Sequence, residues 1–133
     1  MKAVHVSGKR KRAIGRATMY SGSGIIRINH QSLDTYSQKL YRMKIYEPLF
    51  LAGDIANKVD VDIVISGGGV ASQAEVARLV VAKGLVEFTK DDKLKEAFLT
   101  YDRNLLVADV RRNEPAKPNR QGKARAKRQK SYR

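Results

Sequence analysis

The sequence contains no cysteine and no tryptophan. Without cysteine the chain can form no disulfide, no thiolate metal site and no cysteine nucleophile. It has no run of about 18 apolar residues, so we expect no membrane-spanning helix. Residues 1–5 lack the apolar stretch that begins a secretory signal, and we expect no signal peptide.

Acidic residues are scarce: the chain has 13 Asp and Glu against 27 Lys and Arg, a net charge of +14. A surplus this large predicts a polyanionic partner, above all nucleic acid. Residues 1–16 carry +6, residues 111–133 carry +9, and residues 17–110 carry −1. For a chain of 133 residues we predict one globular α/β domain over 1–110 and an extended basic tail over 111–133.

The tail has almost no apolar side chains from Pro115 onward, so it cannot offset the entropy cost of ordering. We therefore expect it to be disordered away from its partner. Gly122, Ala124 and Ala126 lie between its basic residues and would let the backbone pass between packed RNA helices, where Tyr132 could stack. This composition predicts recognition of phosphate and shape rather than base sequence.

Apolar periodicity predicts a single sheet with helices packed on it. The expected strands are residues 3–7, 13–20, 25–28, 59–65 and 105–110, and the expected helices are 35–46, 71–88 and a segment that begins near Asp91. The small residues 21–24 predict a hairpin between the second and third of these strands.

The first expected helix would open with a capping box, Thr35-x-x-Gln38. Leu40 and Met43 would lie on its inner face, and Pro48 would interrupt it.

No segment has the pattern of a catalytic or metal site. Gly67-Gly68-Gly69 follows a strand, but no lysine stands where it would reach a phosphate, so we expect a tight turn in which glycine allows a close approach. His5 and His30 have no ligand-spaced neighbours, and Asp60 and Asp62 fit the solvated face of a strand. We predict no enzymatic activity, no cofactor and no metal.

Several motifs resemble the universal small-ribosomal-subunit protein nine family in its archaeal and eukaryotic form. They are Gly8-Lys9-Arg10-Lys11-x-x-Ile14-x-Arg16-Ala17, Gly24-Ile25-Ile26-Arg27-Ile28-Asn29, Glu47-Pro48-Leu49, Gly67-Gly68-Gly69-x-x-x-Gln73-x-x-x-Ala77-Arg78, Asp102-Arg103-x-Leu105-Leu106-Val107-Ala108-Asp109-x-Arg111-Arg112 and Gln129-Lys130-Ser131-Tyr132-Arg133. Val110 stands where eukaryotic relatives are expected to have proline, which favours an archaeal source.

The resemblance implies an α+β fold with a single mixed sheet, similar to the second domain of small-subunit ribosomal protein five, with a left-handed βαβ unit. It implies a place in the head of the small subunit of the cytoplasmic ribosome, next to other head proteins, and no membrane or small-molecule partner. The residues expected to bind ribosomal RNA are Lys9, Arg10, Lys11, Arg12, Arg16, Gly67, Gly68, Gly69, Gln73, Arg78, Arg111, Arg112, Lys117, Arg120, Lys123, Arg125 and Lys127. Those expected near the anticodon arm of peptidyl-site tRNA are Arg128, Lys130, Ser131, Tyr132 and Arg133.

Two alternatives share the same charge pattern. One is a free-standing nucleic-acid binder, such as a DNA-compacting protein or an RNA chaperone. The other is a phosphate-binding enzyme of the same wider fold group, which includes small-molecule kinases.

Overall fold

One five-stranded sheet organises the part of the chain that the computed structural model describes, residues 3–119 and 124–125. The strand order is β1-β2-β5-β3-β4. The strands are β1 Ala3–Arg10, β2 Ala13–Ser21, β3 Ile26–Ile28, β4 Gln31–Ser32 and β5 Val59–Ser66. β2 is antiparallel to both β1 and β5, whereas β3 is parallel to β5. The predicted α+β class with a single mixed sheet is confirmed.

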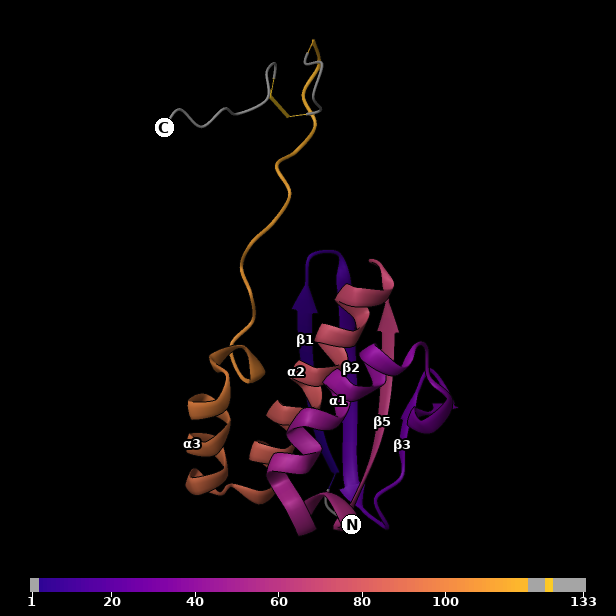
Figure 1. Cartoon of the computed structure of the whole chain (residues 1–133), viewed down its shortest axis with the longest axis vertical. Helices are drawn as coiled ribbons and strands as arrows, with labels where there is room; N and C mark the ends of the chain where they lie inside the picture. The colour runs from indigo at the N-terminus through magenta and orange to yellow at the C-terminus, as the bar shows by residue number, and fades with distance from the viewer. Residues whose placement is uncertain (1–2, 120–123, 126–133) are drawn as a thin grey trace.

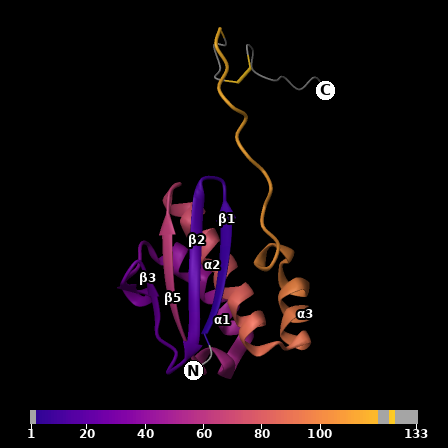
Figure 2. The same cartoon turned by 180° about the vertical axis from the view of Figure 1, so that it is seen from behind.

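Helices cover one face of this sheet and leave the other open (Figures 1 and 2). The described helices are α1 Lys39–Ala52, α2 Val70–Thr89 and α3 Asp92–Tyr101, with short 3-10 turns η1 Leu33–Thr35, η2 Gly53–Lys58 and η3 Arg103–Leu105. α2 packs on β1 and β2, α1 packs on α2, and α3 contacts both α1 and α2. Asp91 caps α3 by accepting a hydrogen bond from the N–H of Lys93, which confirms the expected helix start.

The connection from β3 through α1 to β5 has an unusual hand. In Figure 1 the helices lie in front of the sheet, β5 points upward with β3 parallel to it, and the chain passes from β3 to its left-hand neighbour β5. A crossover in that direction is left-handed, whereas nearly all parallel crossovers are right-handed. The hand expected from the family resemblance is therefore present.

The predicted hairpin between residues 13–20 and 25–28 is wrong, because β5 lies between β2 and β3. The connecting loop instead crosses the start of β5 and is fixed there by Asp60. One carboxylate oxygen of Asp60 accepts hydrogen bonds from the N–H groups of Ser23, Gly24 and Ile25 at 2.9–3.1 Å. These N–H groups, foremost that of Ile25, hold the pKa of Asp60 below its usual value. Asp60 is therefore an anchor for the loop as well as a residue of the outer strand face.

The first helix begins later and lasts longer than predicted. Thr35 belongs to η1, where its hydroxyl donates to the carbonyl of Ser32, and no capping box forms. Pro48 lies inside α1 and does not interrupt it. The inward face carries Ile45 and Pro48, whereas Leu40 and Met43, expected to be inside, are exposed.

The predicted last strand over 105–110 is absent. Leu105 ends η3 with a fully buried side chain, and residues 106–119 contain no helix or strand. This apolar run is long enough for a strand, but only Leu105 is buried in the core and Leu106 partly buried against it, and the chain then leaves the body. The division between a domain over 1–110 and a tail over 111–133 stays a prediction.

The core lies between the sheet and α2. The predicted strand over 59–65 and helix over 71–88 are confirmed, and their inward side chains are buried. α2 comes close to β2 at Gly15, where an added Cβ would lie 2.4 Å from Cγ1 of the fully buried Val76. Glycine at this point therefore sets the distance between helix and sheet.

We predict that Gly15→Ala lowers the free energy of unfolding by about 1–3 kcal/mol, the usual cost of overpacking a core. Chemical denaturation of the full chain would measure it. Gly69→Ala is the matched control, because a Cβ at Gly69 meets no atom within 4 Å and the backbone there is extended. Equal losses in both variants would contradict the role given to Gly15.

Candidate nucleic-acid interface

The glycines after β5 lie against the turn between β1 and β2. Gly67 and Gly68 have φ values of +79° and +69°, a region that side chains with a Cβ rarely adopt. A Cβ on Gly67 would lie 2.6 Å from the carbonyl oxygen of Arg12, and one on Gly68 would lie 3.0 Å from the backbone N of Ala13. The close approach that glycine permits is therefore made to the protein's own basic turn.

Gly69 is the N-cap residue of α2, and no side chain caps the helix there. Gln73, one turn into the helix, donates from Nε2 to the carbonyl oxygen of Gly67 at 3.0 Å and so fixes the loop. The free N–H groups of the first turn and the helix dipole together favour negative charge at this end of α2.

Residue Arg112 closes the same region from the other side. Its Nη1 donates to the carbonyl oxygen of Lys11 at 2.9 Å. A groove of about 960 Å³ lies between the turn, the glycines and residues 112–116. We call six of the residues that line it the basic cradle: Lys11, Arg12, Gly68, Gly69, Ser72 and Arg112. The one acid of the lining, Glu114, is paired with Arg125. Basic residues about 100 positions apart in the sequence thus meet at one end of the sheet.

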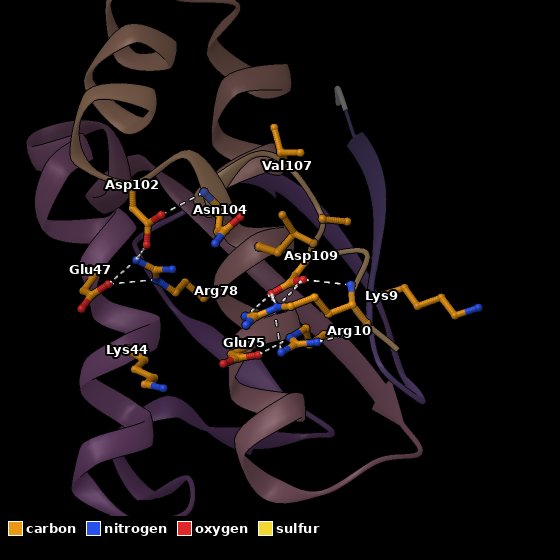
Figure 3. Close-up of a pocket in the computed structure, with 13 residues that line it drawn as sticks. Lys9, Arg10, Lys44, Glu47, Glu75, Arg78, Asp102, Asn104, Val107 and Asp109 are labelled. Carbon is orange, nitrogen blue, oxygen red and sulfur yellow. Dashed lines mark hydrogen bonds and ion pairs between the residues drawn. The ribbon is translucent and has the colours of Figure 1, made fainter. Parts of the chain in front are cut away.

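Next to the cradle, an ion-pair network holds the start of the tail (Figure 3). Arg10 contacts Glu75 at 2.8 Å and Asp109 at 3.5 Å, and its own side chain is only 12% exposed. Arg10 also donates to the carbonyl oxygen of Arg111 at 3.3 Å. Asp109 in turn accepts from the backbone N–H and the guanidinium of Arg111. Residues 109–111 are therefore bound to Arg10 of β1, which is itself bound to Glu75 of α2.

The charge on Asp109 is strongly stabilised. The guanidinium and the N–H of Arg111, with Arg10 nearby, hold the pKa of Asp109 far below its usual range. Because folding lowers this pKa, the ionised Asp109 side chain stabilises the folded state. That stabilisation is complete above the pKa of an aspartate in the unfolded chain, and it is lost as the pH falls toward the lower pKa of Asp109 in the folded protein. Asp109 is therefore fully charged at neutral and mildly acidic pH.

A second cluster ties the helices together beside this network, on its left in Figure 3. The guanidinium of Arg78, on α2, contacts Glu47 of α1 at 2.6 Å and Asp102 at 3.1 Å. Asp102 also accepts from the N–H of Asn104 at the start of η3. That N–H, followed by Arg78, lowers the pKa of Asp102. Arg78 is 14% exposed, so its guanidinium is mostly used within the protein.

Comparison with known proteins places this arrangement in a family. The profile described as ribosomal protein S9/S16 matches residues 8–133. The chain is 52% identical to small ribosomal subunit protein uS9 of Methanococcus vannielii and 53% identical to that of Methanococcus maripaludis strain C7. Both alignments cover 100% of this chain and 100% of the relative.

The chain belongs to the ribosomal protein S9/S16 family. It is a structural, RNA-binding constituent of the small subunit of the cytoplasmic ribosome and not an enzyme. The expected family is confirmed, and relatives from Methanococcus agree with the expected archaeal type. Among the described residues, no group of three or more His, Asp or Glu could hold a metal ion. In that same part of the chain, no helix is long and apolar enough to cross a membrane.

Other residues expected to bind RNA lie at several places on this S9/S16 protein. Lys9 is exposed beside the network, Arg16 is exposed on the open face of the sheet, and Lys117 is exposed beyond the cradle. Arg125 pairs with Glu114 at 2.5 Å. Eight further residues lie outside the described part of the chain: Arg120, Lys123, Lys127, Arg128, Lys130, Ser131, Tyr132 and Arg133.

Sequence reasoning missed the acidic partners of the arginines. Glu75, Glu47 and Asp109 were not singled out, because they come from α2, α1 and the chain after η3 and meet only in the fold. It also missed Arg27 on the open face of the sheet, 3.9 Å from Asp62 of the neighbouring strand. The alternation of exposed and buried residues along β3 is the signal that could have indicated Arg27.

We predict that Asp109→Asn loosens the start of the tail, because Arg10 and Arg111 lose their shared carboxylate. The backbone N–H of Arg111, which donates to Asp109, should then exchange faster with deuterated solvent at neutral pH. Asp54→Asn serves as the control, since Asp54 is exposed in η2 and remote in sequence from the network. Unchanged exchange at Arg111 would contradict the role of Asp109.

Proposed function

We propose that the basic cradle is the site where this protein holds small-subunit ribosomal RNA in the head of the subunit, and that its tail extends to the peptidyl site. The observation that carries the proposal is the meeting of Lys11, Arg12 and Arg112 with the uncapped start of α2. Cations and free backbone N–H groups directed at one groove favour an RNA phosphate.

Within this proposal the basic residues have two different roles. Lys9, Lys11, Arg12, Arg16 and Arg112 have exposed side chains and would contact phosphates directly, as would the exposed Lys117 in the described part of the tail. Arg10 and Arg78 are covered and paired with acids, so they would position the chain around the cradle. Gln73 and the three glycines would shape the loop that faces the RNA.

The tail is the second part of the proposal. Residues 111–133 carry ten basic groups and one acid, and the described part of the tail leaves the body at the cradle (Figure 1). Such a segment would order as its charges are neutralised by phosphate. By the family resemblance its last residues, Arg128, Lys130, Ser131, Tyr132 and Arg133, would contact the anticodon arm of peptidyl-site tRNA. That contact would help to hold the tRNA without any bond-making chemistry.

Charge removal in the cradle tests the first part. We predict that Lys11→Ala and Arg12→Ala each weaken binding to small-subunit ribosomal RNA and each lower the slope of log affinity against log salt by about one. Filter binding at several salt concentrations would measure both effects. Lys93→Ala is the matched control, because this exposed lysine begins α3 at the opposite end of the molecule (Figure 1). An equal loss in all three variants would indicate non-specific attraction, as in a free-standing nucleic-acid binder.

Shortening of the tail tests the second part. We predict that small subunits reconstituted with a chain that lacks Arg133 bind peptidyl-site tRNA more weakly by about 1 kcal/mol, the typical net value of one charged contact. Removal of 126–133 should weaken it further. Both deletions leave Arg112 and the cradle intact, so the incorporation of the chain into subunits should be unchanged. Unaltered tRNA affinity in both would refute the contact between tail and tRNA.

A further inference from the structure

Helix α1 has a second apolar face that the body does not use. Leu40, Met43, Phe50 and Leu51 are 63%, 54%, 75% and 36% exposed. At 100° per residue these four positions fall within an arc of roughly 100° on the helix surface, away from the buried Ile45, Pro48 and Ala52. In Figure 1, α1 lies at the front of the molecule, and no described element covers it. We call these four side chains the α1 stripe.

The surroundings of the α1 stripe are basic. Lys39 and Lys44 flank it on the two sides of the helix, and neither forms an ion pair or a side-chain hydrogen bond among the described residues. Glu47, which lies within the same arc, is neutralised by Arg78 at 2.6 Å. The stripe therefore offers an apolar centre between two free positive charges, which complements apolar side chains with acidic neighbours.

A groove continues this surface toward the edge of the sheet. Phe50 stacks on Tyr46 with ring centroids 5.8 Å apart. Beside these rings, a groove of about 590 Å³ is lined by Leu33, Leu49 and Ile25, which is itself 45% exposed. Asp34, which accepts a hydrogen bond from the Tyr46 hydroxyl, and Asp54 also line it, so the positive charge of this surface lies along the helix and not in the groove. One large apolar side chain of a partner could enter the groove while others lie along the helix.

Neither RNA nor a second copy of the chain fits this surface well. Double-helical RNA presents phosphates and riboses, which gain nothing from Leu and Met and lose hydration against them. The exposed area of the stripe is on the order of 400 Å², half of the roughly 800 Å² per partner that a stable dimer buries. A two-fold pairing would also place the same lysines, Lys39 and Lys44, on both sides of one contact.

We propose that the α1 stripe is a docking surface for an apolar, acid-flanked segment of another small-subunit protein. The inference rests on the proposed function, because a patch of this size supports a lasting contact only where an RNA scaffold holds both proteins in place. The α1 stripe would then contact a protein, whereas the basic cradle would contact RNA.

Site-specific photocrosslinking tests the identity of the partner. The full chain would carry p-benzoylphenylalanine in place of Met43, be assembled into small subunits, purified within them and irradiated. We expect a crosslink to a peptide of another small-subunit protein that has apolar and acidic residues next to the linked site. The same probe in place of the exposed Ser7, on the open face of the sheet, is the matched control and should not give that peptide.

The outcomes separate this inference from the proposed function. A crosslink to ribosomal RNA, to a second copy of the chain or to nothing, in a chain that has entered the subunit, would overturn the docking surface alone. Failure of the unmodified chain to enter small subunits would overturn both proposals.

Substitution of two side chains of the α1 stripe gives an independent test of the docking surface. Met43→Ser with Phe50→Ser should leave the affinity for naked ribosomal RNA unchanged, because both side chains are exposed. Thermal stability should fall only slightly, through the lost stacking of Phe50 on Tyr46 and the lower helix propensity of Ser. When this double variant competes with the unaltered chain during assembly, the fraction of small subunits that contain the variant should fall several-fold. Ile14→Ser with Val64→Ser removes two exposed apolar side chains, 45% and 56% exposed, from the open sheet face and should compete equally. Equal occupancy of both double variants would refute the proposal.

Discussion

Helix α2 lies directly on β1 and β2 because glycines remove the side chains that would hold it away. An added Cβ at Gly8 or Gly15 would collide with Leu79 or Val76 of the helix. Burial of the apolar face of α2 then places its remaining groups: the uncapped first turn at the basic cradle, Glu75 beside Arg10, and Arg78 between α1 and η3. The interface and the start of the tail both depend on this one packing contact, since each uses residues that α2 holds in position.

The fold separates the basic residues into two groups, those paired within the protein and those exposed to solvent. Arg10 and Arg78, only 12% and 14% exposed, are paired with carboxylates, and their Coulomb attraction is screened less than that of a fully exposed pair. Lys11, Arg12 and Arg112 remain exposed at the cradle. The paired arginines fix the geometry of the backbone, and the exposed residues are then available to a phosphate. A count of basic residues alone treats all of them as equal.

The elements with strong local signals were predictable. β5 alternates strictly, α2 carries a long apolar face, and Asp91 supplies its own cap for α3. The elements with competing signals were not. The small residues 21–24 are typical of a hairpin, but β5, which begins only at Val59, enters the sheet between β2 and β3 and separates them. Helix α1 has two apolar faces, and only its contact with α2 decides which one is buried.

The sequence by itself determined the family and the charge distribution with its two basic ends, because composition and motifs do not depend on distant neighbours. Only the tertiary structure decided that the two ends meet, that the triple glycine packs on the basic turn, and that Glu75, Asp109, Glu47 and Asp102 neutralise two of the expected RNA ligands. These contacts join residues 24–101 positions apart, and a one-dimensional pattern contains no signal for the packing that brings such residues within a few ångströms.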